Sequence, residues 1–552
     1  MSQSLQLISD FNIEVLGRLL ANSPEDPPVE AVTAPFNQVF QTLASSADNA
    51  ATIGLLWTRP EGVIASYEKA LRFEGYDRDA VLAEVDTFAD AVLSYASQRK
   101  FVLVVQWVPT TNDRGHGMLD WRPRIGLRGL MAGMQLRLAE QLSEAANVYV
   151  VDPERWVSGH RTASADKMWF ATKMPFENEA FKKAAADIKG ILQGLAGTSR
   201  RLIVLDLDDT LWGGVVGEQG WQALRLGGHD FRGEAYAAFQ RELNSLTRRG
   251  IQLAVVSKNT ESIALDAIDN NPEMLLRQTD LAGWRINWRD KAQNIRELSD
   301  ELNLGLASMV FIDDDPLERA RVRDELPEVL VPEWPKDPAH FVSALHALNC
   351  FEKSAFNKED AGRTAMYVTE RERRTSRTQH QSFDDWLLTL EIEVAVAGLS
   401  PETMPRVAQL FNKTNQMNLS TRRMSQEEIS AWAEGEERWF VTARVRDRYG
   451  DSGLAGIVSV EQIDDVAYLR DLILSCRVMG RRVEETLLAL AVEHAREQGA
   501  KQLVATYLPT ERNAPCLQVF RESQLIEEDQ VFRWDCSKPY PRPACTTVVH
   551  LG

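Results

Sequence analysis

The first part of the chain alternates short apolar runs with stretches whose apolar residues recur at helical spacing. Three runs have the length and composition of buried strands: 51–57, 100–107 and 148–151. A helix is predicted over 11–20, and the Pro-rich stretch 23–35 is predicted to be a loop. Because strand and helix patterns alternate, we predict a doubly wound α/β domain over residues 1–199, the N-terminal domain.

In the next region, apolar runs end directly in polar residues: 202–205 before Asp206, 251–256 before Ser257 and 308–312 before Asp313. The carboxyl ends of parallel strands meet at one edge of a sheet, where α/β proteins bind their ligands. A single helix, 234–249, is expected between the first two runs, which leaves no room for a large cap domain. We predict a second α/β domain over 200–351, the central domain, with an open site.

The rest of the chain changes character. Residues 352–385 are highly charged with helical propensity, and we interpret them as an exposed connecting helix rather than a nucleic-acid-binding segment. An α+β domain, the C-terminal domain, is predicted over 386–552. Its expected strands are 390–396, 438–446, 455–460, 466–475 and 502–507, and its expected helices are 404–412, 483–499 and 509–520.

Composition sets limits on the partners. The chain has 552 residues, too many for one core, with 44% hydrophobic and 26% charged residues. Its net charge of −18 argues against nucleic acid or an acidic membrane surface as a partner. The five cysteines lack metal-ligand spacing, and the sequence has no signal-peptide or membrane-spanning pattern. We therefore expect a cytoplasmic protein with reduced thiols.

The candidate chemistry begins in V-L-D-L-D-D-T-L-W-G-G, residues 204–214. Asp206 follows the strand and is placed to act as a nucleophile, with Asp208 as general acid or base. Ser257 is placed to bind a phosphate oxygen, and Lys291, at the head of a helical pattern, to neutralise a phosphorylated aspartate. Each signal alone also fits a solvated turn or surface lysine, but together they favour a phosphoryl-transfer site.

A group of carboxylates follows the third run. Asp313, Asp314 and Asp315 precede Pro316 in F-I-D-D-D-P. Such a run often caps a helix, but with Asp206 it also offers the hard oxygen ligands that Mg²⁺ prefers. We therefore predict a Mg²⁺ site with few protein ligands.

These four segments resemble the four motifs of the haloacid dehalogenase (HAD) superfamily. D-L-D-D-T-L-W-G-G-V-V-G-E, with S-K-N and F-I-D-D-D-P-L-E-R, resembles the FkbH-like branch. The resemblance implies that Asp206 is nucleophile and metal ligand, and that Asp208 is the acid/base, with its backbone carbonyl on the metal. It further implies phosphate binding by Thr210, Ser257, Lys258 and Asn259, charge stabilisation by Lys291, and Mg²⁺ binding by Asp313 and Asp314.

The N-terminal domain stands where FkbH-like proteins carry an SGNH-hydrolase-like domain. The stretch that begins with Ser9 is at best a remnant of the nucleophile motif, and the segment from Asp152 to His160, with Asp166, lacks the D-x-x-H spacing. His116 and His160 lie in polar loops, which favours surface histidines over catalytic bases. We expect a scaffold or docking role rather than catalysis.

The C-terminal domain carries a second candidate site. A strand that passes into R-x-x-G-R-R and then into a helix resembles the pyrophosphate cradle of GNAT acyltransferases. The resemblance implies binding of coenzyme A or phosphopantetheine by Cys476, Arg477, Gly480, Arg481 and Asn513. The alternative is a helix N-terminus with incidental arginines. Two polar segments, 413–423 and 447–453, are predicted to be either binding loops or surface turns.

No nucleotide-activation motif is present, so an acyl transfer here would start from an activated donor. The FkbH-like resemblance implies 1,3-bisphosphoglycerate as donor and a glyceryl thioester on an acyl carrier protein as product, for polyketide or related biosynthesis. Leu207 stands where glycerate-loading members often carry cysteine, which leaves Cys476 or a carrier thiol to accept the acyl group. The alternatives are transfer to a sugar or amine in surface glycan biosynthesis, a simple phosphatase with inert flanking domains, and a non-enzymatic assembly protein.

Overall fold

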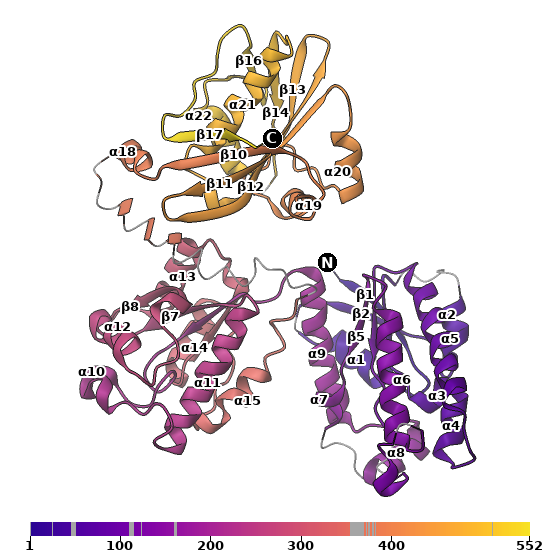
Figure 1. Cartoon of the computed structure of the whole chain (residues 1–552). Helices are drawn as coiled ribbons and strands as arrows, with labels where there is room; N and C mark the ends of the chain where they lie inside the picture. The colour runs from indigo at the N-terminus through magenta and orange to yellow at the C-terminus, as the bar shows by residue number, and fades with distance from the viewer. Residues whose placement is uncertain are drawn as a thin grey trace. The chain divides into compact units, whose positions relative to one another are not determined.

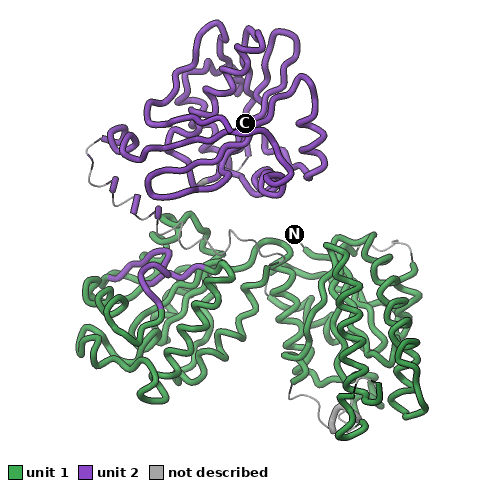
Figure 2. Tube along the Cα trace, in the orientation of Figure 1, with its two compact units in different colours: residues 1–251, 256–275, 287–357 green, residues 252–255, 276–286, 358–552 purple. Residues whose placement is uncertain are grey.

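The structure is a computed structural model (Figure 1). It describes residues 2–24, 26–45, 51–109, 115–122, 124–158, 163–353, 369–370, 372–373, 376–377, 380, 382–510 and 512–551, without the side chains of 163–166 and 476. Its contacts divide into two compact units (Figure 2). Unit 1 comprises residues 1–251, 256–275 and 287–357, and unit 2 comprises 252–255, 276–286 and 358–552.

The N-terminal domain is built on a five-stranded parallel sheet in the order β2-β1-β3-β4-β5. Its strands are β1 (Gln3–Ile8), β2 (Val29–Thr33), β3 (Ile53–Leu56), β4 (Phe101–Val105) and β5 (Val148–Val151). Its helices of seven or more residues are α1 (Glu14–Asn22), α4 (Ala65–Leu71), α5 (Arg78–Ala96), α6 (Leu127–Leu142), α8 (Ala163–Thr172) and α9 (Asn178–Ala196). Shorter helices are α2 (Val39–Ala44), α3 (Pro60–Val63) and α7 (Glu154–Val157).

The doubly wound prediction for this domain agrees with the sheet, but two of its strands, β1 and β2, were not predicted. The predicted loop 23–35 contains the edge strand β2, whose residues are mostly exposed and whose sheet partner is β1. An edge strand needs no apolar pattern on both faces, so the periodicity did not reveal it. Two separate apolar clusters cover the sheet, one packed with α1 and α9 and one packed with α5 and α6.

The central domain has a four-stranded sheet in the order β8-β7-β6-β9. Its strands are β6 (Leu202–Leu205), β7 (Gln252–Ser257), β8 (Leu281–Ile286) and β9 (Met309–Ile312). Its helices are α10 (Val216–Gln219), α11 (Phe231–Arg248), α12 (Glu261–Asn270), α13 (Lys291–Leu302), α14 (Pro316–Glu325) and α15 (Phe341–His346). The single turn α10 precedes the predicted helix between the first two motifs, so the connection is still too short for a cap domain.

The C-terminal domain has an eight-stranded sheet in the order β15-β16-β14-β13-β12-β11-β10-β17. Its strands are β10 (Ile392–Gly398), β11 (Arg438–Asp447), β12 (Gly450–Ile463), β13 (Val466–Leu474), β14 (Gln502–Thr506), β15 (Ile526–Glu528), β16 (Val531–Asp535) and β17 (Thr546–His550). Its helices are α18 (Phe383–Leu388), α19 (Met404–Lys413), α20 (Gln426–Ala433), α21 (Val483–Glu497) and α22 (Ala514–Glu522).

Two further expectations can be placed against the fold. The connecting helix predicted over 352–385 falls largely outside the described residues, and α18 covers its end. Among the helices that the structure describes, none combines the length and the apolar character that crossing a membrane requires.

Candidate active site

The site forms where two neighbouring parallel strands of the central domain end. β6 and β9 pair in register from Leu202 with Met309 to Leu205 with Ile312, and the Asp206 amide continues the ladder to the Ile312 carbonyl at 3.0 Å. Asp206 and Asp313 therefore leave adjacent strands side by side. Carboxylate oxygens of Asp206, Asp313 and Asp314 all lie within 4.8 Å of one another.

Lys291 joins this cluster from the first turn of α13, which Asp290 caps by accepting a hydrogen bond from the Gln293 amide. The Lys291 ammonium lies 2.6 Å from Asp313 Oδ2 and 3.0 Å from Asp206 Oδ1. Burial would lower the pKa of Lys291, but the two aspartates outweigh it and the net shift is upward. Lys291 is therefore a permanent cation facing the nucleophile candidate.

One ammonium does not balance three carboxylates. Burial and the nearby Asp206 charge raise the pKa of Asp313, and the same two causes, with Asp209, raise the pKa of Asp314 to about 6. The buried Asp206 Oδ1 atom accepts no hydrogen bond within the described part of the chain, although it lies within ion-pair distance of Lys291. A site in which one ammonium meets three clustered carboxylates, two of them with raised pKa values, fits a divalent cation.

Asp208 lies outside the three-carboxylate cluster and is held by three donors. Its Oδ1 accepts hydrogen bonds from Trp212 Nε1 at 2.9 Å and from the Val216 amide at 3.1 Å, and its Oδ2 accepts from Asn259 Nδ2 at 2.9 Å. Burial raises the pKa of Asp208, and these hydrogen bonds oppose that shift. The side chain therefore has a defined orientation beside Asp206.

The residues predicted to bind phosphate have different surroundings. Thr210 is buried with its hydroxyl 3.4 Å from Asp314 Oδ1, and Ser257 is buried at the end of β7. Lys258 makes a 2.5 Å ion pair with Glu318, and Asn259 donates to Asp208. Lys258, Asn259 and, at a longer distance, Thr210 are thus engaged with carboxylates of the protein, whereas Ser257 lies at the end of β7.

Sequence reasoning missed the contribution of Trp212. Its indole is fully buried four residues after Asp208, and it appeared in the first motif without a role. The available signal was chemical: an indole N–H is a donor only and, when buried, needs an acceptor nearby. A carboxylate four residues away was the obvious partner.

In the N-terminal domain, the aspartate that follows the first strand is already paired with an arginine. Asp10, just after β1, accepts from the Arg59 amide and Nε, both at 2.8 Å, and Arg59 stacks over Trp169. The carboxylate is fully buried, and burial raises its pKa despite Arg59. Ser9 accepts a hydrogen bond from the Phe11 amide. His160 and the Asp166 side chain lie outside the described residues, so the expected scaffold role stays a prediction.

The candidate anion loop of the C-terminal domain is paired internally. The Gly480 amide donates to Glu484 Oε1 at 2.6 Å, where an anion would bind a helix N-terminus. Arg481 is buried and reaches Asp447, Glu370 and the Arg477 carbonyl. Glu370 and Asp447 also pair with Arg373. These groups do not fit an external phosphate in this arrangement, and the Cys476 side chain lies outside the described residues.

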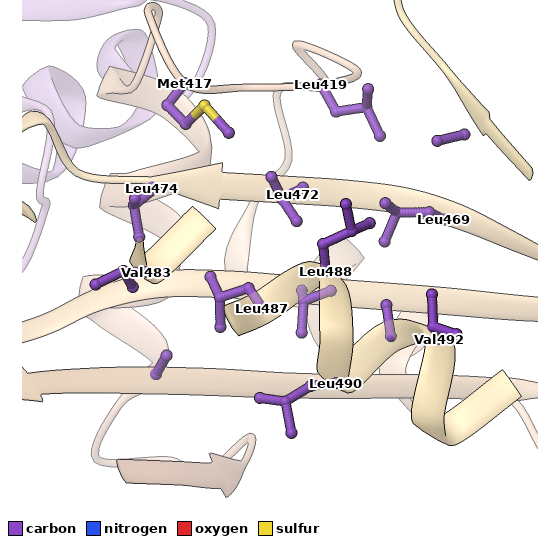
Figure 3. Packing of buried hydrophobic residues seen from close by; sticks show 14 of the residues in the cluster. Met417, Leu419, Leu469, Leu472, Leu474, Val483, Leu487, Leu488, Leu490 and Val492 are labelled. Carbon is purple, nitrogen blue, oxygen red and sulfur yellow. The ribbon is translucent and has the colours of Figure 1, made fainter. Parts of the chain in front are cut away.

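The polar segment 413–423 was predicted to be a binding loop or a surface turn, but its central residues are neither. Residues 417–419 are fully buried, and Met417 and Leu419 lie beside β13 (Figure 3). Asn418 pairs with Ile473, beyond Leu469, where the pairing of β13 with β14 ends. The Leu419 amide donates to the Leu472 carbonyl at 3.2 Å, and the Leu474 amide donates to the Met417 carbonyl at 3.0 Å. Backbone groups that the sheet leaves unpaired are thus satisfied from within the chain.

Asn513, predicted to contact pantetheine, secures this inserted segment instead. The side chain is fully buried, and its Nδ2 donates to the Asn418 carbonyl at 3.2 Å and to the Leu508 carbonyl at 2.8 Å. Its Oδ1 accepts from the Tyr507 hydroxyl and the Thr510 amide, both at 2.7 Å. These four hydrogen bonds occupy both polar atoms of the Asn513 side chain.

Comparison with known proteins supports a phosphatase-type domain. No protein-family model and no curated protein matches the chain. A solved structure of the N-terminal part of a Bacteroides fragilis protein, which contains a phosphatase domain and was determined with Mg, is 26% identical. The match covers 64% of this chain and 95% of that chain, with a TM-score of 0.58. The chain is an enzyme with a phosphatase-type domain; the FkbH-like branch and the SGNH-like fold stay predictions.

Acetyltransferases match a smaller part of the chain. Spermidine N-acetyltransferase from Vibrio cholerae is 15% identical over 26% of this chain and 96% of its own, with a TM-score of 0.22. Ribosomal-protein-S18-alanine N-acetyltransferase from Escherichia coli is 11% identical over 26% of this chain and 95% of its own, with a TM-score of 0.20. Scores this low carry no argument, so the acyltransferase assignment of the C-terminal domain stays a prediction.

Proposed function

We propose that the protein is a Mg²⁺-dependent phosphatase or phosphotransferase in which Asp206 is the nucleophile. The observation that carries the proposal is the cluster of Asp206, Asp313 and Asp314 at the ends of β6 and β9, in which the Lys291 ammonium pairs with Asp206 and Asp313. Phosphoryl transfer needs a positioned nucleophile and positive charge near the transferred group. The cluster provides the nucleophile, Asp206, and Lys291 provides part of the positive charge. A bound cation would provide the rest.

The proposed chemistry has two balanced steps. An Asp206 oxygen attacks phosphorus, the bond from phosphorus to the leaving oxygen breaks, and Asp208 gives that oxygen a proton. Water then attacks the aspartyl phosphate and passes a proton to Asp208, and the bond to Asp206 breaks. Phosphate is released and both carboxyl groups return to their starting states. Lys291 stabilises negative charge on the phosphoryl oxygens throughout.

The carboxylates of Asp206, Asp313 and Asp314, with the Asp208 carbonyl, are the groups that would hold Mg²⁺. When bound, the ion supplies the positive charge that three clustered carboxylates lack and orients the phosphoryl group. Thr210 and Ser257, buried beside the cluster and at the end of β7, are the proposed phosphate contacts.

The finer proposal is the conversion of 1,3-bisphosphoglycerate to a glyceryl thioester on an acyl carrier protein. It rests on the FkbH-like resemblance and on a connection between the first two motifs that is too short for a cap, because an uncapped site suits a substrate presented on a macromolecule. Leu207 is fully buried and carries no thiol, so the carrier thiol would attack the acyl carbon directly, with loss of its proton and release of the C1 phosphate. Asp206 would then remove the C3 phosphate by the two steps given above. No residue of the C-terminal domain is assigned a step.

A second candidate is a simple phosphatase with inert flanking domains. The observation that favours it is the internal pairing of the Gly480 amide and the Arg481 guanidinium, which occupies the groups that an acyl donor would need. Transfer of the acyl group to a sugar or amine, as in surface glycan biosynthesis, is an outcome of the same test. A non-enzymatic assembly role would require function to survive Asp206→Asn.

Intact-protein mass spectrometry separates these functions. The full chain is incubated with 1,3-bisphosphoglycerate, Mg²⁺ and a phosphopantetheinylated acyl carrier protein, and released phosphate is measured in parallel. A glyceryl adduct on the carrier supports the finer proposal, and phosphate release alone supports the simple phosphatase. Asp206→Asn should abolish the glyceryl adduct, leaving at most a phosphoglyceryl one, and should abolish enzymatic phosphate release when the carrier is omitted. Asp324→Asn, which removes an exposed carboxylate from α14, is the matched control. Equal activity in Asp206→Asn would overturn the proposed function.

A further inference from the structure

The side chain of Asp208 is fixed from both sides by residues that the sequence motifs leave without this role. Trp212 is fully buried, and its Nε1–H donates to Asp208 Oδ1 at 2.9 Å. Asn259, buried after β7, donates from Nδ2 to Asp208 Oδ2 at 2.9 Å. The two donors come from segments about fifty residues apart in the chain, so only the fold brings them to one carboxyl group.

We propose that Trp212 and Asn259 are positioning residues that hold Asp208 in line for proton transfer to the leaving group. The inference rests on the proposed phosphatase function and adds two residues to it. It also gives the two oxygens of Asp208 different roles: Oδ1 fixes the side chain and Oδ2 carries the transferred proton. Neither residue touches the reacting atoms in this account; both act through Asp208.

The hydrogen bonds assign the transferred proton to one oxygen. Asp208 Oδ1 already receives two donors, from Trp212 and from the Val216 amide at 3.1 Å. Asp208 Oδ2 receives one, from Asn259, which leaves it the position for a proton. Asn259 cannot turn to accept that proton, because its Oδ1 already accepts from the Thr260 amide at 3.0 Å. Oδ2 is therefore the oxygen from which a proton would pass to the leaving group.

The local backbone supports this arrangement. Asp209 adopts a left-handed φ of 53°, which Asp tolerates, and its Oδ1 accepts from the Gly214 amide at 2.8 Å. This turn brings Trp212 back to Asp208. Without the indole donor, Oδ1 keeps only the Val216 amide and the carboxyl group gains freedom to rotate.

Misplacement of the acid has a chemical signature that loss of stability does not share. A nitrophenolate disperses its negative charge and leaves without a proton, whereas a phenolate leaves more readily when the acid protonates it. The bond to the leaving group breaks in the first step, which kcat/KM reports because that value covers the reaction up to the first irreversible step. Loss of positioning should therefore lower kcat/KM selectively for the poorer leaving group.

The experiment compares phenyl phosphate with 4-nitrophenyl phosphate, two substrates of similar size, using the full chain with saturating Mg²⁺. Trp212→Phe keeps the ring bulk and removes the donor. Trp334→Phe is its matched control, because Trp334 is also buried in the central domain and its Nε1 has no hydrogen-bond partner among the described residues. Asn259→Leu removes the donor to Asp208 Oδ2 and leaves Trp212 unchanged.

In Trp212→Phe and in Asn259→Leu, kcat/KM for phenyl phosphate should fall about tenfold more than for 4-nitrophenyl phosphate. Trp334→Phe should leave this ratio unchanged. An equal loss for both substrates, or no loss for either, in both variants overturns the inference while leaving the phosphatase function intact. If the wild-type chain hydrolyses neither substrate with Mg²⁺, the proposed function itself fails.

Discussion

The central domain and the C-terminal domain both gather charged residues near strand ends, but they leave those charges in opposite states. In the central domain Asp206, Asp313 and Asp314 meet one ammonium, and a buried Asp206 oxygen accepts no hydrogen bond among the described residues. In the C-terminal domain Glu370 and Asp447 each pair with two arginines, Arg373 and Arg481, so both carboxylates of these ion pairs have guanidinium partners.

We expect this difference between a reactive site and a structural one. Unbalanced, desolvated carboxylates cost free energy in the folded protein, and sites that bind cations or react are where such a cost is found. A balanced buried network satisfies itself and leaves no group to bind a ligand. Similar sequence signals, a strand followed by charged residues and a helix, therefore carry different meaning in the two domains.

The largest expected effect tests the unbalanced side. Asp206→Asn removes the nucleophile, so hydrolysis of 4-nitrophenyl phosphate should fall at least about a thousandfold. Because the change also relieves repulsion with Asp313 and Asp314, the unfolding midpoint of the Mg²⁺-free protein should not decrease. Retained activity would place the chemistry elsewhere, and a large loss of stability would mean that the cluster is structural.

The balanced side is tested by Arg481→Met. Removal of one buried cation leaves Asp447 and Glu370 with Arg373 alone, and we expect a loss of about 3 kcal/mol in the stability of the C-terminal domain. The measurement is proteolysis across a urea series, with mass spectrometry assigning cleavage to residues 386–552. Phosphatase activity should be unchanged.

Arg444→Met is the matched control for that substitution. Arg444 makes an exposed ion pair with Asp451 in the same domain, and its loss should cost less than about 1 kcal/mol. If Arg481→Met leaves stability unchanged and abolishes a carrier-dependent activity, Arg481 binds a ligand and the comparison between the domains fails.

Mg²⁺ binding should depend on pH, because a proton competes with the ion for Asp314. Burial and the neighbouring charges raise the pKa of Asp314 to about 6, so its carboxyl group gains a proton as pH falls through that value and must lose it to bind the ion. Affinity should therefore weaken from pH 7.5 to pH 5.5, at least about fourfold for one competing proton. Titration calorimetry at both pH values measures it, and a constant affinity would contradict the raised pKa.

The smallest expected effect concerns thiols of the C-terminal domain. Burial raises the pKa of Cys516 to about 12 and, with Asp535, the pKa of Cys536 to about 11, so neither forms much thiolate near neutral pH. Both should resist iodoacetamide in the folded protein at pH 8 and react after unfolding in urea, as peptide mass spectrometry would report. Rapid labelling of either would reveal an accessible nucleophile in a domain that we regard as internally satisfied.

Several elements could be predicted because local pattern was sufficient. The runs that became β5, β7 and β9 are almost continuously apolar, and the helices α19 and α21 followed from their apolar spacing. The edge strand β2 carries no such pattern, so its segment was taken for a loop. Residues 413–423 were also misinterpreted, because polar residues on both sides conceal a fully buried segment, 417–419.

The sequence by itself determined which residues end the strands of the central domain, because apolar runs and the polar residues after them are properties of neighbours in the chain. Only the tertiary structure decided how those residues pair. It joined Asn259 and Trp212 to Asp208, left the Asp206 cluster short of cations, and gave Arg481 two internal carboxylates. The physical reason is that charge balance and hydrogen bonding depend on distances between segments far apart in the chain, which local sequence does not encode.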